Sequence, residues 1–175
     1  MTLGVVEAAF VEELGRARIG STYNQYRSMR LRERLCVYLA ARRGAPILLV
    51  GEAAGYRGAR VSGIPFTSER QLTGAGPAEA TATIVHRVLS ELDLEDDVLL
   101  WNVVPTHPGT ATTNRAPTRD EIVAARRFLD ELTRNRRIIG VGQLASRVLA
   151  APYVRHPSHG GAAEFAADLR RTLAA

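Results

Sequence analysis

The chain has 175 residues, 46% of them apolar and 23% charged, which is an ordinary balance for a globular protein and fits one domain over residues 1–175. No apolar run approaches the roughly 20 residues that span a bilayer, and no secretory signal pattern is present, so we expect no membrane segment and a cytoplasmic location. The net charge is +5 and every basic residue is arginine, which suits a nucleic-acid partner because guanidinium groups bind phosphates bidentately.

The first half of the chain alternates helical and strand-like patterns. Apolar spacing predicts helices over residues 2–17 and 31–43, with a loop between them. A short apolar strand is expected over residues 47–50. The segment 51–77 then holds six glycines and two prolines. It predicts a long loop, and loops of that length in compact domains are often functional.

The second half repeats the alternation. A helix over residues 78–92 and a strand over 98–104 lead to a second loop, after which Thr118 and Glu121 have the spacing of a capping box and predict a helix to residue 133. Further elements are expected at 137–141 (strand), 143–150 (helix), 153–155 (strand) and 161–173 (helix). This pattern predicts an α/β fold, a three-layer α/β/α sandwich with a central, mainly parallel four-stranded sheet.

Four side chains with useful chemistry are expected at one edge of this sheet. Glu52 follows the first strand, Asn102 lies in the second and His156 follows the fourth, while Phe66 lies in the long loop. Phe66 can stack on a flat ring, and the Asn102 amide matches adjacent N–H and C=O groups. His156 can stabilise negative charge on an oxygen, and Glu52 can orient water or stabilise a cation. Together they predict a pocket for a pyrimidine whose glycosidic bond is broken.

The motifs around these residues resemble those of the uracil-DNA glycosylase superfamily, and most closely the branch whose first motif is Gly-Glu-Ala-Pro-Gly. They are Gly51-Glu52-Ala53-Ala54-Gly55, Gly63-Ile64-Pro65-Phe66, Asn102-Val103-Val104, Asn114-Arg115-Ala116-Pro117-Thr118 and His156-Pro157-Ser158. They occur in the family's order over about residues 45–165, so the resemblance covers most of the chain.

This resemblance implies a monofunctional DNA N-glycosylase of base-excision repair, which flips uracil out of single- or double-stranded DNA and hydrolyses its N-glycosidic bond. Glu52 and His156 take the catalytic positions. Base binding is implied for Phe66, Asn102, Gly51, Ala53 and Tyr56. DNA contacts are implied for Arg57, Arg60, Pro65, Thr67, Ser68, Pro157, Ser158, His159 and Gly160. We expect a monomer.

Three departures from the family pattern bear on these expectations. Ala54 replaces the motif's proline, which predicts a less rigid loop. The branch usually holds an iron–sulfur cluster on four cysteines, whereas Cys36 is the single cysteine here, so we expect no metal or cofactor. Gly55 stands where uracil-specific members place a tyrosine against the thymine methyl, with Tyr56 adjacent.

Other interpretations stay open at this point. The chain could act on other deaminated bases such as hypoxanthine or xanthine, or bind uracil-containing DNA with little turnover. Taken singly, Glu52 also fits a helix cap or an ion pair with arginine, and Phe66 fits a core aromatic.

Overall fold

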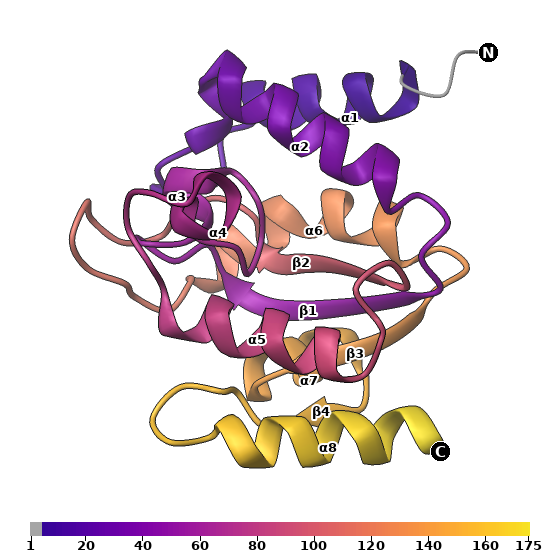
Figure 1. Cartoon of the computed structure of the whole chain (residues 1–175). Coiled ribbons are helices and arrows are strands. Elements are labelled where there is room, and N and C mark those ends of the chain that lie inside the picture. The colour runs from indigo at the N-terminus through magenta and orange to yellow at the C-terminus, as the bar shows by residue number, and fades with distance from the viewer. Residues whose placement is uncertain (1–4) are drawn as a thin grey trace.

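The fold is a parallel sheet whose strands alternate with helices along the chain (Figure 1), in a computed structural model that describes residues 5–175. The elements are α1 (Val5–Arg16), the 3-10 helix η1 (Gln25–Arg27), α2 (Met29–Ala41), β1 (Ile47–Ala53), α3 (Ala59–Ser62), α4 (Glu69–Thr73), α5 (Ala80–Glu91), β2 (Val98–Val104), α6 (Arg119–Thr133), β3 (Arg137–Val141), α7 (Gln143–Leu149), β4 (Tyr153–Val154) and α8 (Ala162–Ala174). The first residues of the helix predicted over 2–17 lie outside the described residues.

The four strands are all parallel and lie in the order β2-β1-β3-β4. In register, Gly51 of β1 pairs with Asn102 of β2. Because the strands are parallel, their carboxyl ends meet at one edge, where the loops after β1 and β4 also emerge. The predicted α/β fold with a parallel four-stranded sheet is therefore confirmed.

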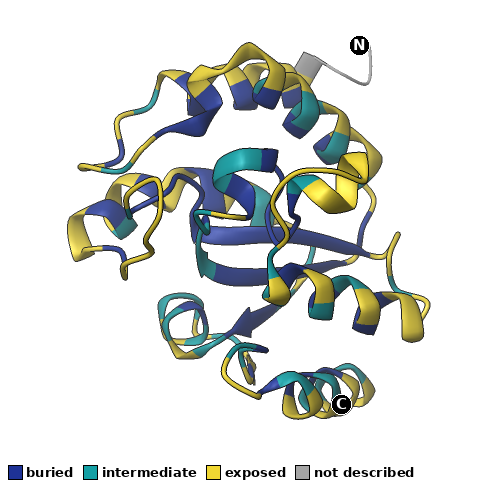
Figure 2. Ribbon diagram, turned by 60° about the vertical axis from the view of Figure 1, so that its left-hand side comes forward, coloured by how far each residue is buried: buried dark blue, intermediate teal, exposed yellow. Residues whose placement is uncertain are grey.

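Helices cover both faces of the sheet, and the strands between them are buried (Figures 1 and 2). Alternate residues of β2 pack on opposite faces of the sheet. Leu99 and Trp101 join the cluster under α1, α2 and α6, while Val98 and Leu100 join the cluster under α5 and α8. Each large side chain buried in this way contributes about 1.5–3 kcal/mol. Within residues 5–175, no helix combines the length and apolar content needed to cross a bilayer.

The long loop predicted over residues 51–77 is wrong in two respects. β1 continues to Ala53, so Glu52 lies within the strand, and the rest of the segment contains α3 and α4. Helices of four and five residues are too short to show apolar periodicity. Their C-caps carry the readable signal, since Gly63 and Gly74 adopt φ values of 79° and 75°, which favour glycine.

Candidate active site

A small chamber opens at the carboxyl edge of the sheet. Its volume is about 60 Å³, and it adjoins a wider groove of about 500 Å³. The chamber is lined by Glu52, Ala53, Gly55, Ala59, Phe66, Glu79, Thr81, Asn102 and His156. The four side chains singled out from the sequence therefore come from four separate segments and line one cavity.

Gly51 brings the base-binding candidates together. A Cβ atom at this position would lie 2.3 Å from Cζ of Phe66 and 2.8 Å from Oδ1 of Asn102, so only glycine leaves room for both side chains against β1. Asn102 is 4% exposed, and no described residue forms a hydrogen bond with its amide. Because Asn102 lines the chamber, its amide is available to accept from and donate to a ligand there.

Phe66 lies on a tightly held loop. Its φ of 52° is in the left-handed region, where residues other than glycine are strained. The hydroxyl of Ser62 braces the loop by donating to the carbonyl of Thr67 at 2.6 Å and accepting from the amide of Ile64 at 3.0 Å. Tyr26 also donates to the carbonyl of Gly63 at 3.1 Å. The ring is thus held in place beside the chamber, although it also packs against the apolar core.

Glu52 has neither of the structural roles that its position alone allows. Among the described residues, none donates a hydrogen bond to its carboxylate or forms an ion pair with it. Partial burial raises the pKa of this carboxyl above its ordinary value. An unpaired, partly desolvated carboxylate facing a cavity is typical of a functional group.

His156 is held as a neutral imidazole with a defined tautomer. The backbone N–H of Ser158 donates to Nδ1 at 3.2 Å, and the Ser158 hydroxyl lies 2.8 Å from the same nitrogen. Because Nδ1 accepts from the backbone, its proton belongs on Nε2, which is left as the donor. Burial, with the nearby charges of Arg155 and His159, lowers the pKa of His156, so the ring is neutral at pH 7.

The first motif is held by the end of β2 and by the loop that follows it. The amide of Ala54 donates to the carbonyl of Val104 at 3.3 Å, and the Ala54 carbonyl lies 2.7 Å from Nδ1 of the buried His107. A proline at this position would lose the first of these bonds. These hydrogen bonds constrain the backbone at Ala54 in a way that a proline ring would not, and the lower rigidity expected from Ala54 stays a prediction.

The second loop is anchored by its own motif. The Asn114 side chain accepts from the Tyr56 amide at 2.9 Å. Arg115 donates to both carboxylate oxygens of Glu121, at 2.6 and 2.8 Å, and Glu121 also closes the predicted capping box with Thr118. The capping box is confirmed. This motif ties the loop after β2 to the loop after β1.

Several residues assigned to base or phosphate contact lie elsewhere. Tyr56 does not line the chamber but faces a side groove with Arg57 and Arg60. Thr67 and Ser68 are buried, and their hydroxyls are used within the protein: Thr67 contacts His86 and the carbonyl of Pro65, and Ser68 contacts Gln71.

Buried prolines are equally unsuited to phosphate contact. Pro65 and Pro157 are both buried, and proline has no N–H to donate. We therefore withdraw Tyr56 from the base pocket, and Pro65, Thr67, Ser68 and Pro157 from the DNA surface. Their role is to shape the loops that carry Phe66 and His156.

The remaining candidates for DNA contact lie in the side groove and on the loop after β4. Arg57 is exposed, and Arg60 stacks on Tyr23 with its guanidinium carbon 4.7 Å from the ring centroid. His159 and Gly160 form the exposed tip of the loop after β4, with φ values of 53° and 77°. Ser158 is partly buried because it holds His156.

Sequence reasoning missed three residues at the opening. Arg155 precedes the His-Pro-Ser motif and lines the groove, and its adjacency to that motif was an available signal. Glu79 and Thr81 at the start of α5 line the chamber itself. No motif marks them, since an acid before a helix usually reads as a favourable end charge.

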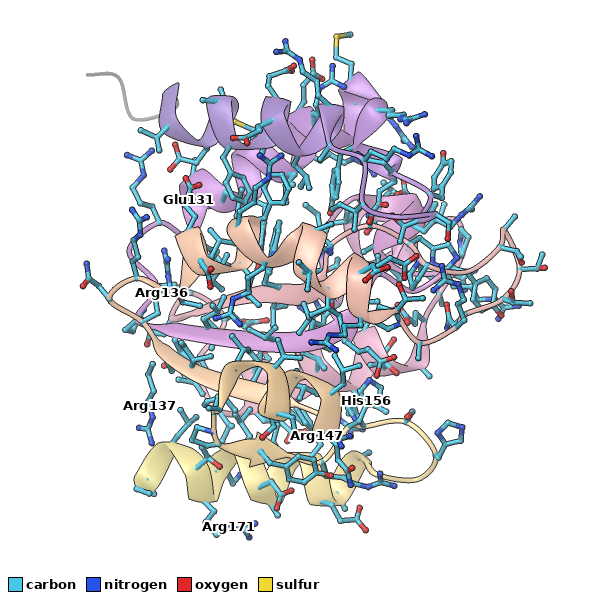
Figure 3. The ribbon with its side chains drawn as sticks, turned by 180° about the vertical axis from the view of Figure 1, so that it is seen from behind. Glu131, Arg136, Arg137, Arg147, His156 and Arg171 are labelled. Atoms are coloured by element: carbon cyan, nitrogen blue, oxygen red, sulfur yellow. The ribbon has the colours of Figure 1, made fainter. Side chains whose placement is uncertain are left out.

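The basic cluster at residues 134–137 lies at the other end of the sheet. Figure 3 shows Arg136 and Arg137 at the end opposite to His156. Arg136 donates to the carbonyls of Leu132 and Ala45, and Arg137 to that of Leu173. These arginines close the amino-terminal edge of the sheet.

A second large hollow, of about 580 Å³, lies between α2, α4 and α5, away from these residues. Its polar lining is committed in part to ion pairs, such as that of Arg34 with Glu69 at 2.7 Å. Over residues 5–175, no group of three or more His, Cys, Asp and Glu side chains could hold a metal ion.

Comparison with known proteins agrees with this architecture. The family model described as the uracil DNA glycosylase superfamily matches residues 39–171. The crystal structure of wild-type SMUG2 from Pedobacter heparinus superposes with a TM-score of 0.67, covering 96% of each chain at 12% sequence identity, a likeness that concerns the fold. Among curated proteins, none gives a significant sequence match.

Proposed function

The chain belongs to the uracil DNA glycosylase superfamily, a superfamily of DNA glycosylases, and on that premise we propose that it hydrolyses the N-glycosidic bond of uracil in DNA. The observation that carries the proposal is the chamber, in which Glu52, Asn102 and His156 meet beside the Phe66 ring. A base inside a duplex cannot reach such a chamber, so the nucleotide is flipped out of the stack.

The base is recognised by stacking and by its hydrogen-bonding edge. Phe66 stacks on the ring, in the position that Gly51 leaves open. Asn102 accepts from N3–H and donates to O4 of uracil, which satisfies the amide left unpartnered by the protein.

The glycosidic bond is weakened from both sides. As it breaks, the electron pair moves onto uracil, and Nε2–H of neutral His156 donates to O2, where negative charge develops. Glu52 stabilises the cationic sugar and orients the water that attacks C1′. The water forms a bond to C1′ and loses one proton, and the uracil anion takes up one proton, so the products are an abasic site and free uracil.

An assay with oligonucleotides that contain one uracil, hypoxanthine or xanthine, single- and double-stranded, tests the proposal. We expect alkali-labile sites at uracil. Glu52→Gln and His156→Ala should each lower the single-turnover rate by about 10²–10³-fold, the usual effect of losing one preorganised stabilising group.

Glu131→Gln, on the outer face of α6, is the matched control and should leave the rate unchanged. Full activity in both site variants would overturn the assignment of these residues. Tight binding of uracil-containing DNA without release would favour a binding protein, and release of hypoxanthine or xanthine alone would favour the purine alternative.

A further inference from the structure

One wall of the chamber is built by the start of α5. Glu79 is the N-cap residue of this helix and Thr81 lies in its first turn, and both side chains line the chamber and the groove outside it. Among residues 5–175, none forms a hydrogen bond or ion pair with the Glu79 carboxylate or the Thr81 hydroxyl. Polar groups placed in a cavity without partners are available to a ligand.

The loop after β1 is shaped around Glu79. A Cβ atom at Gly55 would lie 2.7 Å from Oε1 of Glu79, and one at Gly58 would lie 1.9 Å from Oε2. Neither position could carry a side chain while Glu79 keeps its place. The carboxylate therefore fills the space beside the Gly55 backbone that a larger residue at position 55 would occupy.

The orientation of the base, which rests on the proposed function, shows which edge meets this wall. With Asn102 on N3 and O4 and His156 on O2, three positions of the ring are assigned. N1 carries the sugar, which points to the groove and Glu52. The C5–C6 edge is the part of the base without an assigned contact. Glu79 and Thr81 are the polar side chains of the chamber lining that have not been assigned to another part of the base.

We propose that Glu79, next to Thr81, determines specificity by excluding the C5 methyl group of thymine. Uracil carries only hydrogen at C5 and leaves the carboxylate its access to water. A methyl group at that place would meet the bulk of the side chain and displace water from a polar carboxyl group that has no hydrogen-bond partner among the described residues, which is costly. Burial already raises the pKa of this carboxyl, so further loss of water disfavours its charged form. An apolar wall would discriminate against one methyl group by only about 10–200-fold.

The readout is the ratio of uracil to thymine release from otherwise identical single-stranded oligonucleotides and from mispairs with guanine. Glu79→Ala should lower this ratio at least 10-fold, whatever its effect on the absolute rate. Glu79→Gln keeps most of the bulk without the charge and should give an intermediate ratio. Glu164→Ala, at an exposed acid of α8, is the matched control and should keep the wild-type ratio.

A second measurement separates this proposal from the proposed function. Affinities for uracil- and thymine-containing oligonucleotides, compared with and without Glu79→Ala in a Glu52→Gln background, report selectivity without turnover. Loss of the preference for uracil supports the proposed role of Glu79 even if no base is released. An unchanged preference in folded Glu79→Ala protein, or equal affinity of the parent for both bases, overturns it.

Discussion

At the scale of single residues, the site depends on two opposite shifts of pKa. Burial raises the pKa of Glu52 from 4.5 and, with nearby positive charge, lowers that of His156 from 6.5. In the proposed mechanism, Glu52 must be ionised to stabilise a cation, and His156 must be neutral so that Nδ1 accepts and Nε2–H donates. Each group has its required form at pH values above its own pKa.

This arrangement predicts the acid limb of the pH–rate profile. Protonation of Glu52 begins at a higher pH than for an ordinary glutamate, and protonation of His156 waits for a lower pH than for an ordinary histidine. The single-turnover rate should therefore fall on acidification with a midpoint above 4.5, the ordinary value of a glutamate. Circular dichroism at each pH separates this effect from unfolding, and full activity at pH 4.5 would contradict it.

The sequence motifs predicted the residues that line the chamber better than the residues that surround it. Glu52 and Asn102 lie near the carboxyl ends of β1 and β2, and His156 follows β4, so the parallel sheet brings them together once its topology is known. Thr67 and Ser68 looked accessible because they sit in a glycine-rich loop, but their hydroxyls are needed inside it. Burial depends on contacts between distant segments, which a local pattern does not contain.

At the scale of elements, α6 holds the second loop through Glu121. Its carboxylate is almost completely buried and accepts hydrogen bonds from Arg115, the Thr118 amide and Ser21. The Arg115 guanidinium is the main cause of a pKa lowered to about 2. Removing one partner of such a buried pair leaves the other uncompensated.

Glu121→Gln should lower the free energy of unfolding at pH 7 by about 2–4 kcal/mol, measured by urea denaturation. Because the folded-state pKa is depressed, the carboxylate contributes stability above pH 4.5 and loses it as the pH falls toward 2. The difference from wild type should therefore shrink over that window. Glu131→Gln on the same helix should be neutral, and equal stabilities of the two variants at pH 7 would refute this role.

The helices and strands that show a periodic spacing of apolar residues could be predicted from the sequence. The strands and the six long helices follow from apolar spacing, and the capping box of α6 follows from Thr118 and Glu121. α3 and α4 do not, because one turn of helix buries too few side chains to leave a pattern. Their glycine C-caps would have been the better signal.

At the scale of the whole molecule, the charge distribution predicts how DNA binding responds to salt. Net charge is +5, Arg155 lines the groove outside the chamber, and Arg57 lines the side groove. Each phosphate contact releases counterions and adds about 0.9 to the slope of log affinity against log salt.

Arg57→Ala should weaken binding of all sequences alike and reduce that slope by about 1, as measured by fluorescence anisotropy at several salt concentrations. Arg134→Ala is the control, since this exposed residue follows α6 at the far end of the sheet. A slope altered equally by both variants would place the DNA on another surface.

The strand order also predicts that the two sides of the chamber differ in local stability. β1 is paired on both sides and carries Glu52, whereas β4 is a two-residue edge strand that leads to His156. We expect amide hydrogens of β1 to exchange with solvent more slowly than those of β4, because the end of β4 can open by breaking only a few hydrogen bonds. The side of the chamber that carries Glu52 is thus the more constrained one, and the loop after β4 that carries His156 is the side where a local opening costs least.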